Sequence, residues 1–158
     1  MREKVYIDST IPSYYFDERS SLQPFQEITK RWWDEESQRY ELWTSDAVLQ
    51  ELRQGYYPNK DQIAALMKDI PSLDFEKELE RIARYYMNHF VMPQSLIGDA
   101  IHLAYSSHYN MDYLLTWNCN HLANANKKRH IRIINNRLGL ETPENITPME
   151  LVKEVQND

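Results

Sequence analysis

The chain has 158 residues, of which 42% are hydrophobic and 27% are charged, a size at which one domain can bury a core of its own. A membrane-spanning helix is excluded, because no apolar stretch approaches the run of about 18 residues that such a helix needs. The net charge of −6 argues against a protein that coats nucleic acid through an overall positive field. A negative net charge is compatible with a nucleic-acid-binding site that is itself built from carboxylates and binds divalent cations.

Cysteine usage and the N-terminus indicate the compartment. With Cys119 as its one cysteine, the chain cannot form an internal disulfide, and it has no Cys/His spacing typical of a zinc site. The first residues carry no secretory signal. We therefore expect a cytoplasmic protein.

The first predicted element is a strand over residues 4–8. This segment is rich in β-forming residues and ends in an acid, and Pro12 stops the extended chain soon afterwards. Asp8 is therefore expected at the carboxyl end of the first strand.

Several later segments carry apolar residues at helical spacing. Ser45 is a good N-cap for one of them, and Gln54 and Gly55 stop it. The predicted helices cover residues 24–40, 46–53, 61–68, 76–89, 96–108 and 122–129, with a short last helix over 149–152. Short strands are predicted over residues 41–44, 72–75, 113–116 and 131–134.

Strands that alternate with helices indicate an α/β sandwich with a central, mainly parallel sheet. No repeat, linker or low-complexity segment divides the chain. We therefore expect a single domain over residues 1–158, with a charged, proline-punctuated tail from about residue 144 at its periphery.

Several common chemistries are excluded. The three glycines are too dispersed for a phosphate-binding loop or a dinucleotide fingerprint, and neither GxSxG nor HExxH occurs. An aspartyl-phosphate phosphatase needs a second acid two residues after the first, where this chain has Thr10.

Acids at the ends of apolar elements remain as candidates. Asp8 ends the first strand, and ligands of open α/β sheets bind beyond the carboxyl ends of the strands; capping of the next turn accounts for Asp8 equally well. Glu51, taken alone, resembles any solvent-facing residue of a helix.

Asp99 is the strongest single signal. It interrupts the most apolar helix and shares a face with Ser95 and His102, where an acid is costly unless it is paired or binds a metal. The alternative is a favourable position in the first helical turn. His102 could orient Asp99 or contact phosphate, but a lone helical histidine is more often structural, and we do not count it as catalytic.

Four segments in order carry a resemblance to a known family. They are Val5-Tyr-Ile-Asp8-Ser-Thr, Ser45-Asp-Ala-Val-Leu-Gln-Glu51-Leu, Gly98-Asp99-Ala-Ile-His-Leu-Ala104 and Asp112-Tyr-Leu-Leu-Thr-Trp-Asn118. The chain resembles PIN-domain proteins, and VapC-like toxins most of all, over about residues 5–134. Each segment alone is short, so the resemblance rests on their order and context.

The resemblance implies a three-layer α/β/α sandwich in which acids converge on a site for Mg²⁺ or Mn²⁺. Asp8, Glu51 and Asp99 match the acids of the family, and Asn118 would complete the metal-binding and catalytic set. It further implies a ribonuclease that hydrolyses RNA phosphodiester bonds. VapC-like toxins belong to type II toxin–antitoxin pairs, so a homodimer and a protein antitoxin are implied as well.

Asn118 departs from the family pattern, because many relatives have an aspartate there. Asparagine keeps an oxygen ligand but loses the charge, which should weaken metal binding. A weak or inactive PIN domain that binds RNA or protein is therefore the alternative. Ser9, Thr116 and Asn120 are candidates for auxiliary roles, and Asn120 could substitute for the missing acid.

Two further groups of residues, one basic and one aromatic, have the composition of a binding surface. Lys127, Lys128 and Arg129 form the best local basic cluster and could contact RNA phosphates, although such a run also suits a solvated helix end. Eleven tyrosines and four tryptophans, some in adjacent pairs such as Tyr56 and Tyr57, cannot all face one core. They indicate either a binding surface or a core with tyrosine edges in water.

Overall fold

The computed structural model describes residues 1–89, 91, 97–118, 122 and 124–152. In this part of the chain a five-stranded sheet has the order β3-β2-β1-β4-β5, with every neighbouring pair parallel. The strands are β1 (Lys4–Ile7), β2 (Glu41–Ser45), β3 (Ser72–Leu73), β4 (Tyr113–Leu115) and β5 (Glu144–Ile146). The expected α/β architecture with a parallel central sheet is confirmed.

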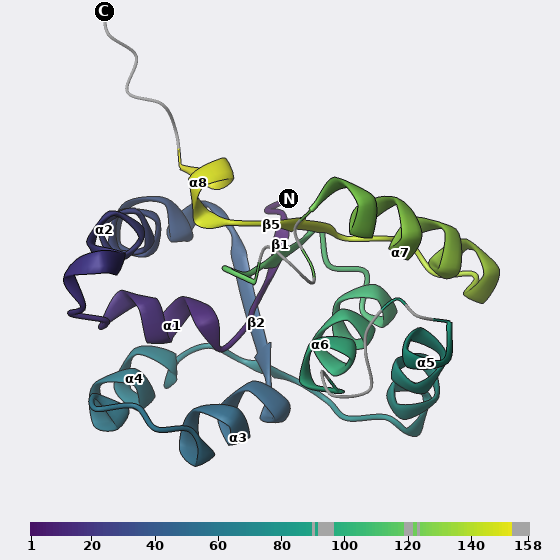
Figure 1. Cartoon of the computed structure of the whole chain (residues 1–158), viewed down its shortest axis with the longest axis horizontal. Helices are drawn as coiled ribbons and strands as arrows, with labels where there is room; N and C mark the ends of the chain where they lie inside the picture. Colours follow the sequence, from purple (N-terminus) through teal and green to yellow (C-terminus); the bar gives the residue numbers. More distant parts are fainter. Residues whose placement is uncertain (90, 92–96, 119–121, 123, 153–158) are drawn as a thin grey trace, which may run out of the picture.

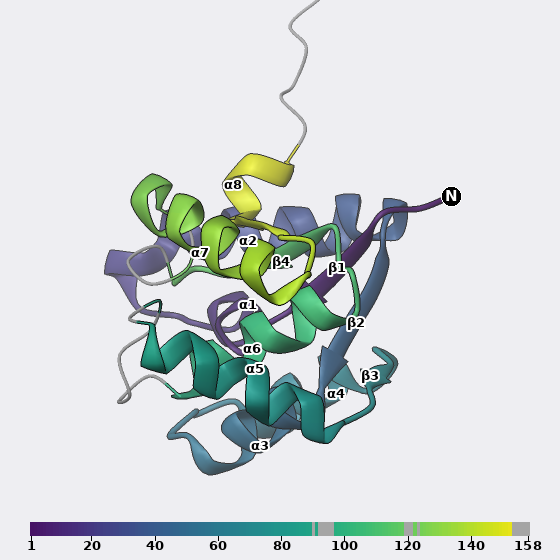
Figure 2. The same cartoon turned by 90° about the vertical axis from the view of Figure 1, so that its right-hand side faces the viewer.

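Helices cover both faces of the sheet. Figure 1 shows α1, α2 and α8 on one side of β1 and β2, and α5, α6 and α7 on the other; in Figure 2 this second group faces the viewer. The helices are α1 (Thr10–Tyr15), α2 (Gln23–Arg31), α3 (Asp46–Gln54), α4 (Lys60–Met67), α5 (Lys77–Asn88), α6 (Ile97–His108), α7 (Ala125–Leu138) and α8 (Pro148–Leu151). None of the helices in the described ranges is long and apolar enough to cross a membrane.

The central strand sets the position of the site. Val5, Tyr6 and Ile7 of β1 are fully buried, as expected for a parallel strand with helices on both faces. β1 lies between β2 and β4, and the chain order of the strands reverses next to it. The crevice for a ligand is therefore expected beyond the carboxyl ends of β1 and β4, immediately beside Asp8.

The segment predicted as one helix over residues 24–40 contains three kinds of helical turn. α2 is followed by a π-helical turn, Trp32–Glu36, and then by a 3₁₀ turn, Ser37–Arg39. The helix α1 is absent from the prediction, because Pro12 indicates only the end of the strand. Proline is tolerated in the first turn of a helix, and Pro12 lies in the first turn of α1.

The prediction of a helix over residues 122–129 followed by a strand over 131–134 was wrong. Residues Ala125–Leu138 form one helix, α7. Ile131 and Ile134 are buried whereas Ile133 is 47% exposed, which is the spacing of a helix and not the alternation of a strand. The Asn124 side chain accepts a hydrogen bond from the Lys127 amide at 2.9 Å and caps the helix.

The tail that is expected from about residue 144 begins with a strand instead. Glu144–Ile146 form β5 and pair with β4 in parallel, and the Thr116 amide donates to the Ile146 carbonyl at 2.9 Å. The strand has only three residues, and buried Asn145 breaks its apolar pattern. A prediction from pattern therefore misses it, whereas the short helix that follows, α8, is at the expected place.

Candidate active site

Asp8 is a buried carboxylate directly after β1, with 1% of its surface exposed. Its Oδ1 accepts hydrogen bonds from the Thr10 amide at 3.0 Å and from the Thr10 hydroxyl at 2.5 Å. The turn interpretation of Asp8 is thus confirmed. Turn formation alone does not require a buried charge, however, because an exposed aspartate makes the same bond.

Burial raises the pKa of Asp8 from 3.8 to about 6. The positive charge of His102 and hydrogen bonds from Thr10 and Thr116 favour the charged form, but they offset only part of the cost of burial. Asp8 is therefore a carboxylate that lacks sufficient positive charge around it. A cation bound at this position would supply that charge.

Glu51 lies on α3 and is held by two partners. The Ser9 hydroxyl donates to Oε2 at 2.7 Å, and His102 Nε2 contacts Oε1 at 2.8 Å. Burial raises the pKa of Glu51, but the hydrogen bond and the charge of His102, together with Ser9, lower it further, and the net pKa lies below its usual value. Glu51 is therefore an ionised, partly buried group and not a solvent-facing helix residue.

His102 connects this carboxylate to the core. The ring is 1% exposed, and its Nδ1 lies 2.8 Å from the Tyr6 hydroxyl, which in turn lies 2.7 Å from the Ser45 hydroxyl. Burial lowers the pKa of His102, but Glu51, Asp8 and Asp99 together raise it above its usual value. The sequence indicates that His102 could orient an acid, because it lies one helical turn after Asp99. It does not indicate that this acid is Glu51.

A glycine allows α6 to approach α3. A Cβ atom at Gly98 would lie 2.7 Å from Glu51 Oε1, which is closer than real Cβ atoms come to other heavy atoms. Gly98 therefore leaves the space in which Glu51 reaches His102. This glycine does not stand out in the sequence, because its function depends on a contact between two distant helices.

Asp99 and Asn118 meet across the crevice. Asp99 lies in the first turn of α6, so the favourable dipole position is confirmed, and its Oδ2 accepts a hydrogen bond from Asn118 Nδ2 at 2.7 Å. The Asn118 amide donates to the Thr116 hydroxyl at 2.9 Å. The segment after β4 is also tied to α1, because the Trp117 amide donates to Thr10 Oγ1 at 2.9 Å.

The remaining candidates are placed differently. Asn120 lies outside the described residues. On α7, Lys127 donates to the Val91 carbonyl at 2.7 Å, and Lys128 Nζ lies 3.9 Å from a carboxylate oxygen of Glu144. Arg129 is exposed. Two of the three predicted RNA contacts are thus engaged with the protein itself.

The donor atoms fit a hard divalent cation by their chemistry, since such ions prefer carboxylate, amide and hydroxyl oxygens. Among the described residues, no group of three or more His, Cys, Asp or Glu side chains is arranged to hold an ion. Glu51 and Asp99 contact His102 and Asn118 instead.

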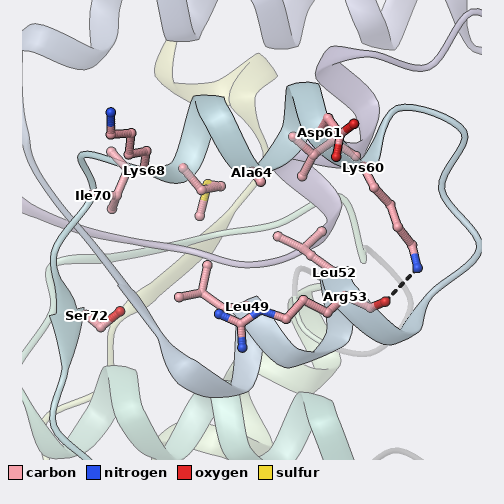
Figure 3. Close-up of a pocket in the computed structure, with 11 residues that line it drawn as sticks. Leu49, Leu52, Arg53, Lys60, Asp61, Ala64, Lys68, Ile70 and Ser72 are labelled. Carbon is pink, nitrogen blue, oxygen red and sulfur yellow. Dashed lines mark hydrogen bonds between the residues drawn. The ribbon is translucent and has the colours of Figure 1, made fainter.

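Two cavities lie near α4. One, of about 540 Å³, lies between α3 and α4; Figure 3 shows Leu49 and Leu52 pointing toward α4, and Lys60 Nζ donating to the Arg53 carbonyl at 2.6 Å. The other, of about 550 Å³, lies between the end of α1 and the loop after α3, and Tyr56 and Tyr57 contribute to its lining.

The comparison with protein families agrees with this geometry. The model of the PIN domain matches residues 5–127, a segment that contains Asp8, Glu51, Asp99 and Asn118. No curated protein matches the chain. PIN domains are generally nucleases that use divalent metal ions. With most of its length matched and the expected parallel sheet in place, the chain belongs to the PIN-domain family.

Proposed function

We propose that this protein is a divalent-metal-dependent endoribonuclease that hydrolyses RNA phosphodiester bonds. The observation that carries the proposal is Asp8, a buried carboxylate with a raised pKa at the carboxyl end of the central strand. Such a group is destabilising for the fold alone, and perturbed carboxylates of this kind are typical of functional sites. Its hydrogen-bonded surroundings link it to Glu51, Asp99 and Asn118.

In this proposal the carboxylates of Asp8, Glu51 and Asp99 and the amide oxygen of Asn118 hold Mg²⁺ or Mn²⁺. The bound cation would polarise the phosphodiester and lower the pKa of the attacking water. Thr10 and Thr116 orient Asp8 through their hydroxyls.

Two neighbours of Glu51 hold it in place for this task. His102 fixes the direction of one carboxylate oxygen, and the Ser9 hydroxyl fixes the other. Because three acids gather here, RNA phosphate is repelled until a cation is bound. We therefore expect weak RNA binding at this site without metal.

A second candidate function is binding of RNA or protein without cleavage. Two observations favour it. Asp99 already accepts a hydrogen bond from Asn118, and the described acids are not grouped as a metal site. Inability of the correctly folded protein to bind Mn²⁺ would favour this second candidate.

The biological setting follows from the resemblance to VapC-like toxins alone. We propose a cytoplasmic toxin of a type II toxin–antitoxin pair, active as a homodimer and silenced by a protein antitoxin. Co-purification with the product of a neighbouring short reading frame tests this setting, and a negative result would leave the nuclease chemistry untouched.

The decisive test of the nuclease is a cleavage assay on a structured RNA of mixed sequence, with Mn²⁺, Mg²⁺ or chelator. Asp99→Asn is the test variant, and Asp74→Asn, which changes an exposed acid outside the site, is the matched control. Metal-dependent cutting by the wild type and the control, lost in Asp99→Asn, is the expected result. Equal cutting by all three proteins would show that the activity lies elsewhere.

A further inference from the structure

The walls of the cavity of about 550 Å³ beside α1 belong to segments that follow residues of the carboxylate site in the chain. One of its walls is α1 and the residues after it, which follow directly from Asp8 and Ser9. The other wall is the loop after α3, and the Gly55 amide at its start donates to the Glu51 carbonyl at 2.9 Å. The Ser9 hydroxyl donates to Glu51 Oε2 at 2.7 Å and so connects the two segments from which these walls extend.

Aromatic rings line this cavity. Tyr56 is fully exposed, with a relative exposure of 106%, and Tyr57 and Phe16 are partly buried. A tyrosine that is so exposed gains nothing from the core of its own fold. Flat rings open to solvent are the usual platform on which unpaired nucleobases stack.

The geometry of the cavity is set before any ligand arrives. A Cβ atom at Gly55 would lie 2.2 Å from Tyr57 Cε2, so the absence of a side chain there lets the ring of Tyr57 lie against the backbone. Asn59 Nδ2 donates to the Phe16 carbonyl at 3.0 Å and connects the loop to the opposite wall. A pre-formed site loses less entropy when it binds a ligand.

The charge of the lining favours a neutral ligand group. Asp17, Glu18 and Arg19 line the cavity, which leaves one negative charge in excess. The Arg19 guanidinium is engaged by Asp17, with Nε at 2.9 and 3.1 Å from the two carboxylate oxygens. A phosphate would therefore meet repulsion here, whereas an uncharged base would not.

The charges of the acids act on Tyr57, one of the residues that line the cavity. Burial raises the pKa of Tyr57, and the charges of Glu51 and Asp8 raise it further. The backbone shows the same closeness, because Ser13, which lines the cavity, donates its amide to the Ser9 carbonyl at 3.3 Å.

We infer that this cavity is a nucleobase subsite, which takes one unpaired base next to the scissile phosphate by stacking on Tyr56 and Tyr57. The inference rests on the proposed ribonuclease function and adds to it the residues that bind a base. A base can enter the cavity only when it is outside a helical stack.

Fluorescence of 2-aminopurine tests the inference without cleavage. A short single-stranded RNA with one central 2-aminopurine is titrated with the full-length protein in chelator, which keeps the RNA intact. The carboxylates then repel RNA equally in all variants and weaken binding, so the titration is carried to protein concentrations that saturate quenching by the wild type. The test variants are Tyr56→Ala, Tyr57→Ala and Gly55→Ala; the control is Phe75→Ala, which removes another exposed ring, 55% exposed, outside the cavity.

The wild type and Phe75→Ala should quench the fluorescence, and the three test variants should bind about tenfold more weakly or worse, as is typical for the loss of one stacked base. A duplex of the same sequence should not compete. Because Tyr56 is fully exposed, its loss cannot unfold the protein. Equal quenching by all proteins would overturn the inference, as would loss of self-association in Tyr56→Ala with unchanged RNA binding.

The subsite and the nuclease can fail separately. Metal-dependent cleavage without quenching would keep the nuclease and overturn the subsite. Quenching that depends on the tyrosines, in a protein that cuts no RNA with any metal, would keep the subsite as part of a binding module and refute the proposed hydrolysis.

Discussion

Replacing Asp8 with asparagine should stabilise the metal-free protein at neutral pH. Asparagine keeps an oxygen that can accept the bonds from Thr10, but it carries no charge. The pKa of Asp8 rises from 3.8 to about 6 on folding, and at about 1.36 kcal/mol per pH unit the buried charge costs about 3 kcal/mol. This value is a net cost, because the pKa of about 6 already includes the attraction between Asp8 and His102.

The pH dependence has a definite sign. Between pH 3.8 and about 6 the folded state binds more protons at Asp8 than the unfolded state does, so the stability of the wild type falls as pH rises through this window. Below the window the carboxyl is protonated in both states. The advantage of Asp8→Asn should thus be largest at pH 7 and should almost vanish near pH 4.

Urea unfolding in chelator at pH 7, 5.5 and 4 measures this difference, with Asp74→Asn as the control for loss of an acid. Groups remote from Asp8 titrate alike in both proteins and cancel, whereas His102, whose pKa Asp8 helps to raise, contributes to the difference. Adding Mn²⁺ should stabilise the wild type by about 2.7 kcal/mol at one hundred times its Kd and the variant by much less. An Asp8→Asn protein that is less stable at pH 7, or whose advantage does not change with pH, would refute the reasoning.

Three further substitutions test the surroundings of the acids. Gly98→Ala places a methyl group 2.7 Å from Glu51 Oε1 and should lower the rate of RNA cleavage about tenfold or more. The free energy of unfolding should change by only about 1 kcal/mol. An unchanged cleavage rate would refute the need for a glycine at this position. Asn118→Asp sets a second carboxylate beside that of Asp99, so we expect a lower melting temperature than that of the wild type in chelator. Adding Mn²⁺ should raise the melting temperature of this variant more than that of the wild type. An equal rise in both proteins would show that residue 118 lies outside the metal site. His102→Gln should lower the free energy of unfolding by about 1–3 kcal/mol at pH 6 and by less at pH 9. The pKa of His102 is raised, so its ion pair with Glu51 is fully present below about pH 6.5 and is lost as pH rises. Double-mutant cycles with Glu51→Gln at both pH values measure this coupling energy, and a coupling that does not change with pH would contradict the prediction.

Much of the fold could be predicted from local pattern. The apolar run before Asp8 and the capping residue Ser45 each identify an element boundary, and the structure has β1 and α3 at these places. Local pattern failed where spacing was ambiguous. Ile131 and Ile134 are compatible with a strand when they are read within four residues, and only their continuation to Leu138 reveals the helix.

The site was predictable in part, because an acid in an apolar segment rarely contributes to packing alone. Asp8 and Asp99 stand out in this way. The contacts of Glu51 do not stand out, since Tyr6 and Gly98 look like ordinary core residues in the sequence, and the place of His102 one turn after Asp99 points to Asp99 and not to Glu51. Their functions arise from contacts between β1, α3 and α6, which lie far apart along the chain.

Whether these acids hold a catalytic cation is tested most directly by anomalous diffraction from crystals soaked in Mn²⁺. We predict a strong peak within coordination distance of Asp8, Glu51 and Asp99, with Glu51 or Asp99 rotated from its present partner, and no such peak in Asp8→Asn crystals. No peak at these residues in well-ordered wild-type crystals, or an equal peak in the variant, would contradict the assignment.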